Sequence, residues 1–166
     1  MKTIYSTSFK TLIVLLCFGA ITVLTHAQAQ PFTLKPLASS RVNPEFETNG
    51  LVTVAMIYQP DCSWCKKQGK ILERAFKQCQ KSMNIVLVGT KGNARQLRKE
   101  LKHYHDDIPA FIANRKFLRN IGGYQASPTT LIYNEEGELI VKKRGFITEE
   151  KLASALAVIS RNSCHI

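Results

Sequence analysis

Two cysteines separated by two residues, Cys62-Ser63-Trp64-Cys65, are the residues of this chain best suited to chemistry. They follow an apolar run at 51–58, which has the length and composition of a buried strand, and a break at 59–61. After Cys65, apolar residues recur at the spacing of one helix face: Leu72, Ala75, Phe76 and Cys79. The sequence therefore predicts a strand, a break and a helix, with Cys62 at the helix start and Cys65 one turn in.

This position suits a reactive thiol. Free N–H groups and the positive end of the helix dipole stabilise a thiolate at the first turn, so we expect a lowered thiol pKa and nucleophilic character at Cys62. Its thiolate would attack a substrate disulfide, and Cys65 would resolve the mixed disulfide. Two other interpretations stay open. The pair could be a purely structural disulfide, or half of a zinc site with His103 and His105 as the candidate second ligand pair.

Residues 1–29 have the pattern of a secretory signal peptide. Lys2 and Lys10 lie in a polar opening, an apolar core spans 12–24, and 27–29 offers a small-residue cleavage site. An uncleaved anchor is the weaker alternative, because the apolar core is short for a membrane span. Beyond this segment the chain has an even set of cysteines, which favours an oxidising compartment and a periplasmic or secreted protein: Cys62, Cys65, Cys79 and Cys164.

The length and composition of residues 30–166 predict a single domain. Residues 30–50 contain three prolines and no sustained period, so we interpret them as an extended arm or linker before a domain at 51–166. Within the domain, the patterns predict a strand at 84–88, helices at 94–105 and 108–121, hairpin strands at 129–133 and 138–143, and a last helix capped by Thr148.

The formal net charge of +11 favours acidic partners or contact with an anionic membrane surface. Basic residues at 95–102 are expected to form one solvated helix face, and no nucleic-acid motif accompanies them, so we expect no nucleic-acid partner. No cofactor is required either, because a dithiol itself carries the two electrons of disulfide exchange.

The order of elements resembles the thioredoxin-like family from about residue 51 to 160. The resemblance is carried by the Cys62–Cys65 motif after a strand, by Ser127-Pro128-Thr129 at the opening of a hairpin, and by Gly145 before the capped last helix. It implies an α/β fold with a central mixed sheet flanked by helices. Together with the export signal, the chain is most similar to protein disulfide oxidoreductases and isomerases of the bacterial periplasm.

The resemblance also assigns roles. It implies a cis Pro128 beside the two cysteines, with Ser127 offering its backbone to an extended substrate, and it implies that this loop keeps metal from the thiols. An ordinary trans turn proline is the alternative. Expected partners are protein substrates with cysteines or disulfides, and a redox partner protein. Isomerase activity is less expected, since a dimerisation domain does not fit before residue 51.

Two positions depart from the family pattern. Met56 stands where many thioredoxins have a buried Asp that serves proton transfer, so water or another group would have to act as the base. Asp61 replaces a common Trp before the first cysteine, and its charge should moderate the lowered pKa of Cys62. Trp64 is expected either to stand partly exposed and contact substrate, or to pack on its own domain.

The fold also implies a second disulfide. The first and last helices of this fold run along one sheet face toward the end opposite the cysteine motif, so Cys79 and Cys164 could meet there. Closing that loop would contribute about 4–5 kcal/mol in the chain-entropy model. The alternatives are a small buried hydrophobe at Cys79 and a loose thiol at Cys164.

The sequence thus predicts an exported thiol–disulfide oxidoreductase, with Cys62 as nucleophile, Cys65 as resolving cysteine and Pro128 shaping the substrate groove. The direction of exchange is not determined by these residues. Two alternatives from other classes remain: a non-catalytic adaptor of an envelope assembly, and a protein that handles copper or zinc through its two soft thiolates.

Overall fold

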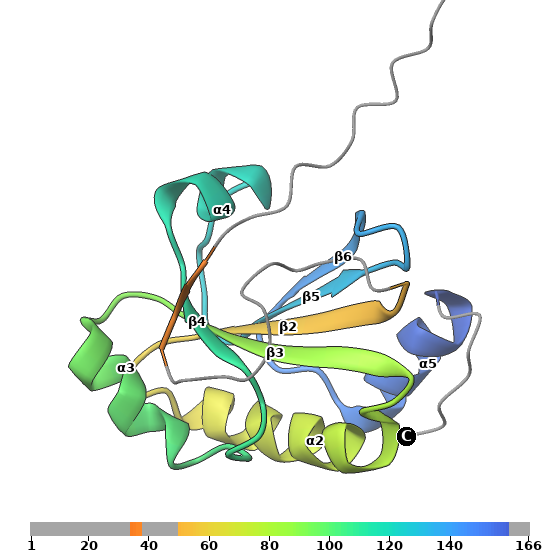
Figure 1. Ribbon diagram of the computed structural model, residues 1–166, viewed down its shortest axis with the longest axis horizontal. Coiled ribbons are helices and arrows are strands. Elements are labelled where there is room, and N and C mark those ends of the chain that lie inside the picture. The colour runs from red at the N-terminus through yellow and green to blue at the C-terminus, as the bar shows by residue number, and fades with distance from the viewer. Residues whose placement is uncertain (1–33, 38–49, 160–166) are drawn as a thin grey trace, which may run out of the picture.

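The computed structural model describes residues 34–37 and 50–159, which form one mixed sheet with helices on both faces (Figure 1). The strand order is β1-β4-β3-β2-β5-β6. The strands are β1 (Lys35–Pro36), β2 (Val52–Tyr58), β3 (Met83–Gly89), β4 (Ala110–Ile112), β5 (Thr129–Tyr133) and β6 (Leu139–Arg144). The helices are α2 (Ser63–Cys79), α3 (Ala94–Leu101), α4 (Arg115–Asn120) and α5 (Glu149–Ile159).

Strand β2 is the centre of the sheet. It pairs in parallel with β3 and antiparallel with β5, and all seven of its residues are buried. Side chains alternate across a strand, so Met56 and Tyr58 enter one hydrophobic cluster while Ala55 and Ile57 enter another on the opposite face. Burial on both faces explains why the sequence of this strand is continuously apolar. The predicted mixed sheet between helices is confirmed.

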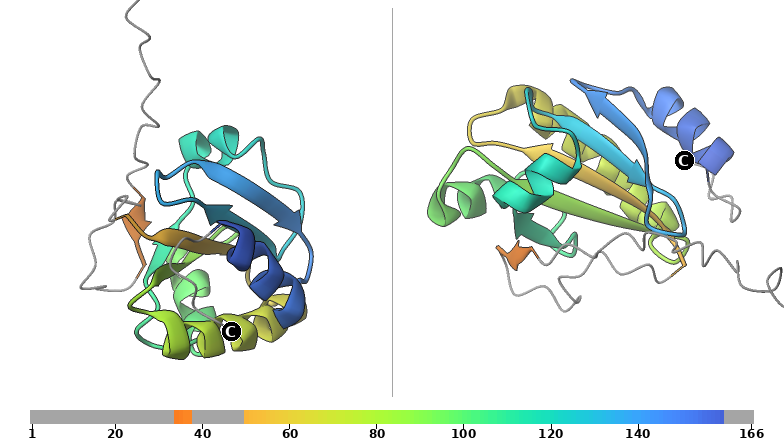
Figure 2. Two further views of the ribbon diagram at one scale, coloured as in Figure 1. Left: turned by 90° about the vertical axis from the view of Figure 1, so that its right-hand side faces the viewer. Right: turned by 90° about the horizontal axis from the view of Figure 1, so that it is seen from above.

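Helices α2 and α5 cover one face of the sheet, and α4 lies over the other (Figures 1 and 2). The apolar face of α2 packs beneath Met56 and Tyr58 through Leu72 and Ala75, and Leu152 of α5 joins the same cluster. Phe117 is the buried residue of α4 on the opposite side. Helix α2 is therefore held against the sheet over most of its length.

The predicted helix at 108–121 is wrong in its first half. Ala110–Ile112 is strand β4, which pairs in parallel with β3, and only Arg115–Asn120 is helical. A short apolar run fits a strand or a buried helix turn equally well, and the free edge of β3 selects the strand. Asn114 then caps the helix, its side chain accepting a hydrogen bond from the Phe117 N–H. Helix α3 also ends earlier than predicted, at Leu101 instead of residue 105.

Part of the predicted arm adds a strand to the sheet. Lys35–Pro36 forms β1, antiparallel to β4, and the Leu37 N–H donates to the Ala110 carbonyl at 2.8 Å. Leu34 and Leu37 on either side are buried. The two leucines therefore attach this segment to the hydrophobic clusters. Over the described ranges 34–37 and 50–159, no helix combines the length and the apolar character that a membrane crossing requires.

Candidate redox site

The two cysteines lie where β2 gives way to α2. Asp61 adopts a left-handed backbone conformation with φ of 56°, which turns the chain from the strand into the helix. Cys62 is the N-cap residue of α2, and its Sγ accepts a hydrogen bond from the Cys65 N–H at 3.1 Å. A sulfur atom thus occupies the place of a capping oxygen, facing the free N–H groups of the first turn. The predicted helix start at the cysteines is confirmed.

Cys62 and Cys65 form a disulfide, with their Cα atoms 5.2 Å apart. The two residues differ in exposure: Cys62 retains 9% of its surface, whereas Cys65 is fully covered. Cys62 is therefore the more exposed of the two cysteines. The roles of attacking and resolving cysteine stay a prediction, and this difference in exposure is in the direction that they require.

The loop before β5 carries a cis peptide bond between Ser127 and Pro128, as the resemblance implied. Thr129, the next residue, is in register with Ile57 near the carboxyl end of β2, so the proline lies at the sheet edge from which the cysteine loop departs. The Pro128 carbonyl accepts a hydrogen bond from the Gly145 N–H at 2.8 Å. Pro128 is buried, and Ser127 is half-buried.

A polar cluster fastens this loop to the end of β2. The Tyr124 hydroxyl donates to Gln59 Oε1 at 3.1 Å and is in close contact with the Ser127 hydroxyl. Burial raises the pKa of Tyr124, against a smaller opposing effect of the hydrogen bond with Ser127, so the phenol stays protonated. Lys91 places its ammonium 5.1 Å from the centre of the same ring. The Ser127–Pro128 backbone is thereby held at a defined position relative to the cysteine loop.

Trp64, between the two cysteines, is partly exposed and also packs on its own domain. It retains 52% of its surface. Its ring also lies 5.6 Å from the ring of Phe146, and the Lys67 ammonium lies 4.3 Å from the ring centre. The side chain is therefore anchored on one side and open to a partner on the other.

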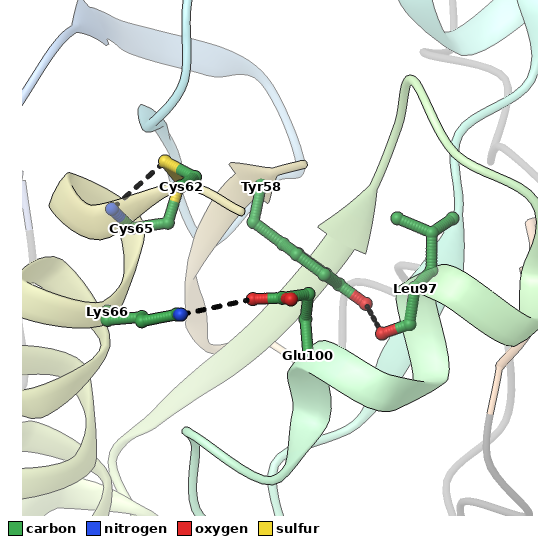
Figure 3. Close-up of polar contacts among 6 residues, drawn as sticks. All are labelled: Tyr58, Cys62, Cys65, Lys66, Leu97 and Glu100. Carbon is green, nitrogen blue, oxygen red and sulfur yellow. Dashed lines mark hydrogen bonds and ion pairs between the residues drawn. A yellow bond between two sulfur atoms is a disulfide. The ribbon is translucent and has the colours of Figure 1, made fainter. Parts of the chain in front are cut away.

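On the inner side of the first turn of α2, a carboxylate approaches from α3. Glu100 is 6% exposed and faces Lys66, with 3.9 Å between Glu100 Oε2 and Lys66 Nζ (Figure 3). Tyr58 reaches the same region from the end of β2, and its hydroxyl donates to the Leu97 carbonyl at 3.2 Å. A charged group thus enters the interior next to the redox pair.

The histidines considered as zinc ligands lie elsewhere. His105 packs its ring 5.2 Å from that of Phe76, in the last turns of α2, and its Nδ1 lies 3.8 Å from Asp107. His103 follows α3, its N–H donating to the Glu100 carbonyl. Across the described part of the chain, no three or more His, Cys, Asp or Glu side chains gather as a metal site would require. The histidines do not complete a site with Cys62.

The second predicted disulfide involves one described residue. Cys79 is buried at the last position of α2, in the cluster shared by α2 and α5. Cys164 lies outside the described residues, so the pairing stays a prediction.

Sequence reasoning missed three residues around the site: Gln68, Glu100 and Tyr124. The first two have a periodic signal, since Gln68 lies three residues after Cys65 and Glu100 three after Leu97, each on the buried face of its helix. Both are polar types that are rarely buried without a partner, so apolar periodicity passed over them. Tyr124 lies in an irregular loop, where the sequence carries no such signal.

No family model matches the chain, and no curated protein does. Solved structures do match. Etrx1, an exposed lipoprotein thioredoxin of Streptococcus pneumoniae, aligns with 78% of this chain and 99% of its own at a TM-score of 0.65 and 16% identity. A secreted disulfide oxidoreductase of Mycobacterium tuberculosis, homologous to DsbE of E. coli, aligns with 76% of this chain and 95% of its own at a TM-score of 0.60 and 14% identity.

StoA from Bacillus subtilis aligns with 74% of this chain and 93% of its own, at a TM-score of 0.60 and 20% identity. Similarity at this level of identity establishes the fold. The chain has a thioredoxin-like fold with a Cys62–Cys65 pair at disulfide distance.

Proposed function

We propose that this protein is an exported thiol–disulfide oxidoreductase that exchanges disulfides with protein cysteines through Cys62 and Cys65. The observation that supports it best is the combination of a capping, accessible Cys62 with a covered Cys65 one turn along the helix. The cis Ser127–Pro128 bond at the adjoining sheet edge agrees with it. The secreted disulfide oxidoreductase of Mycobacterium tuberculosis has a similar fold.

The exchange proceeds by two sulfur displacements. In the reducing direction, the Cys62 thiolate attacks one sulfur of a substrate disulfide, forming a mixed disulfide and releasing one substrate thiolate, which takes up a proton. The Cys65 thiol loses its proton, and its thiolate attacks Cys62 Sγ. This closes the Cys62–Cys65 bond and frees the second substrate sulfur. Two electrons pass to the substrate, and a dithiol partner protein must return two to the enzyme. The reverse sequence oxidises a substrate dithiol.

The cis-proline loop would bind the substrate chain. Ser127 precedes Pro128 and is half-buried, so its backbone is a candidate for a short β-pairing with an extended peptide. The exposed part of Trp64 would contact apolar substrate side chains beside the reacting sulfur.

The test compares two variants that make the same atomic change. Reduction of insulin disulfides, with dithiothreitol as electron donor, is measured for the wild type, Cys62→Ser and Cys65→Ser. We expect turnover in the wild type and none above background in Cys62→Ser. Pre-reduced Cys65→Ser, mixed with insulin after the dithiothreitol has been removed, should form a trapped mixed disulfide. The trapped complex should run as a band that disappears on reduction.

Three results would overturn the proposal. Activity that survives Cys62→Ser, or a wild type without activity, would favour the adaptor interpretation. Stoichiometric copper or zinc in the purified reduced protein would favour a metal-handling role. A titration of the Cys62–Cys65 pair against glutathione then gives the direction of exchange, because the reduction potential relative to the compartment decides which form predominates.

Export is the second part of the proposal. It is supported by the signal-like pattern of residues 1–29. The Mycobacterium tuberculosis neighbour is described as secreted, and Etrx1 as an exposed lipoprotein. A fusion of residues 1–29 to an alkaline phosphatase without its own leader should give active, exported enzyme. Intact mass of the exported protein should show cleavage after Ala29, whereas an uncleaved product would indicate an anchor.

The third part is a structural disulfide between Cys79 and Cys164. Its support is the buried position of Cys79 at the end of α2, in the cluster that also contains α5 residues. Peptide mapping of the alkylated, non-reduced protein should find the two residues joined. Alkylated Cys79 and Cys164 would refute the pairing.

A further inference from the structure

The buried carboxylate of Glu100 is not used by the exchange steps described above. It is 6% exposed, and burial of a carboxylate is costly unless the charge is paired. Its Oε2 has no hydrogen-bond partner among the described residues. At 3.9 Å, Lys66 Nζ is too distant for a hydrogen bond but close enough for a strong charge interaction (Figure 3).

The other groups around Glu100 are two tyrosines, which carry no positive charge. Tyr58 of β2 and Tyr104, which follows α3, lie with their rings 5.5 Å apart at this site. Burial raises the pKa of both phenols, and the Glu100 charge contributes to the rise. The Tyr58 hydroxyl donates a hydrogen bond to the Leu97 carbonyl, and the Tyr104 hydroxyl has no hydrogen-bond partner in the described part of the chain. The compensating positive charge in this set of side chains is Lys66.

Lys66 belongs to the same helical turn as the redox pair. It is the next residue after Cys65, and its N–H donates to the Cys62 carbonyl at 3.2 Å. The other charges adjoining the cysteines are Asp61, which is exposed, and Lys67, which is drawn over the Trp64 ring. Position 56 of β2 holds a fully buried methionine, so that strand supplies no carboxylate beneath the pair. Glu100 is thus a carboxylate that reaches this turn of α2 from a different element, helix α3.

We propose that Glu100, acting through Lys66, is a positioning residue that balances the charge beside the Cys62–Cys65 pair and sets how readily its thiols ionise. The inference rests on the proposed redox function and deepens it. An ammonium group one residue from Cys65 favours the thiolate forms, and the Glu100 carboxylate offsets that effect. The two charges shift the thiol pKa in opposite directions. Removing one of them should therefore leave the effect of the other uncompensated.

The two variants should shift the thiol pKa in opposite directions, and a purely structural role of Glu100 would not produce that result. The thiolate absorbance of the reduced full chain is followed at 240 nm against pH, and the same titration of a Cys62→Ser/Cys65→Ser variant is subtracted, so that the difference reports the macroscopic pKa values of the pair. Glu100→Gln should lower the first thiol pKa by about half a unit, roughly a threefold rise in thiolate fraction. Lys66→Met should raise it by a similar amount, and the double variant should return near the wild type.

The chain offers a matched control in Glu73→Gln. Glu73 also forms an ion pair, with Lys77 of the same helix at 2.6 Å, but its side chain is 33% exposed and lies two turns beyond Lys66. This variant should leave the thiol titration unchanged. A Glu100→Gln titration that coincides with that of Glu73→Gln, or shifts of the same sign in Glu100→Gln and Lys66→Met, would overturn the proposal.

The test remains decisive if a variant does not fold or if the wild type does not reduce insulin. Should Glu100→Gln fail to fold, Lys66→Met alters a partly exposed side chain and still decides the matter, because an unchanged titration there refutes the proposal. The titration uses no substrate. Absence of insulin reduction in the wild type would therefore count against the proposed function alone, and absence of opposed pKa shifts against the role of Glu100 alone.

Discussion

The side-chain amide oxygen of Gln68 accepts a hydrogen bond at 2.8 Å from the backbone N–H of Ile147, 79 residues away in the sequence. Gln68 is fully buried on α2, one turn beyond Cys65, and Ile147 lies in the segment between β6 and α5. Phe146, the preceding residue, packs against Trp64. One buried amide therefore joins the redox helix to the segment that supports the exposed indole.

Replacing Gln68 should destabilise the fold. Gln68→Leu leaves the Ile147 N–H buried without an acceptor, which costs about 1–3 kcal/mol of unfolding free energy. Urea unfolding of the oxidised protein measures the loss. Gln80→Leu makes the same change at an exposed position just past α2 and should stay within about 0.5 kcal/mol of the wild type. Equal unfolding midpoints for the two variants would show that the Gln68–Ile147 hydrogen bond contributes nothing to stability.

Trp64→Ala should affect protein substrates more than small ones. The exposed half of the indole is free to contact a polypeptide, so its loss should raise KM for insulin about tenfold with little change in kcat. Reduction of a small aromatic disulfide, which does not need that contact, serves as the control and should keep its rate. A uniform loss on both substrates would indicate that Trp64 supports the cysteine geometry and does not bind substrate.

The ion pair between α2 and α5 should make stability depend on acidity. Arg74 donates to both oxygens of Glu149, at 3.0 and 2.6 Å, and the hydrogen bond from Arg74 lowers the pKa of Glu149. A carboxyl whose folded pKa is depressed stabilises the fold above its unfolded pKa of about 4.3, and this contribution is lost as pH falls through the folded value.

Glu149→Gln should therefore unfold more easily than the wild type at pH 7, and the difference should shrink below about pH 4. Chemical unfolding at a series of pH values checks this. The double variant Arg74→Gln/Glu149→Gln should behave like the single one, since the two groups act as a pair. A stability difference that stays constant down to pH 3 would contradict the coupling.

Lys142 closes the carboxyl end of α4. Its Nζ donates to the carbonyls of Ile121, Gly122 and Gly123 at 2.7, 3.2 and 2.6 Å. Lys142→Met removes these charge-assisted hydrogen bonds and should cost about 1–2 kcal/mol in urea unfolding. Lys143→Met, at the exposed neighbouring position, is the control and should cost less than about 0.5 kcal/mol. Identical stabilities would show that water replaces the ammonium without loss.

Local pattern alone was enough to locate the redox pair and its supporting elements. The apolar run at 51–58, the break at 59–61 and the helical spacing after Cys65 each depend on interactions within a few residues, and the structure has β2 and α2 in those places. For residues 108–121, local pattern predicted a helix where the structure has a strand followed by a short helix. The apolar run 110–112 fits either type of element, and it became a strand because the edge of β3 was available for pairing.

The sequence by itself determined the cysteine pair at the start of a helix and the hairpin that follows Pro128, because these follow from periodicity, capping and turn residues near one another in the chain. The fold class came from the resemblance of the whole element order to a known family. Only the tertiary structure decided that Cys62 is partly exposed while Cys65 is covered, that Gln68 accepts a hydrogen bond from Ile147, and that Glu100 meets Lys66 beside the pair. Burial and charge pairing depend on which distant segments pack together, and this cannot be predicted from the spacing of residues along one segment.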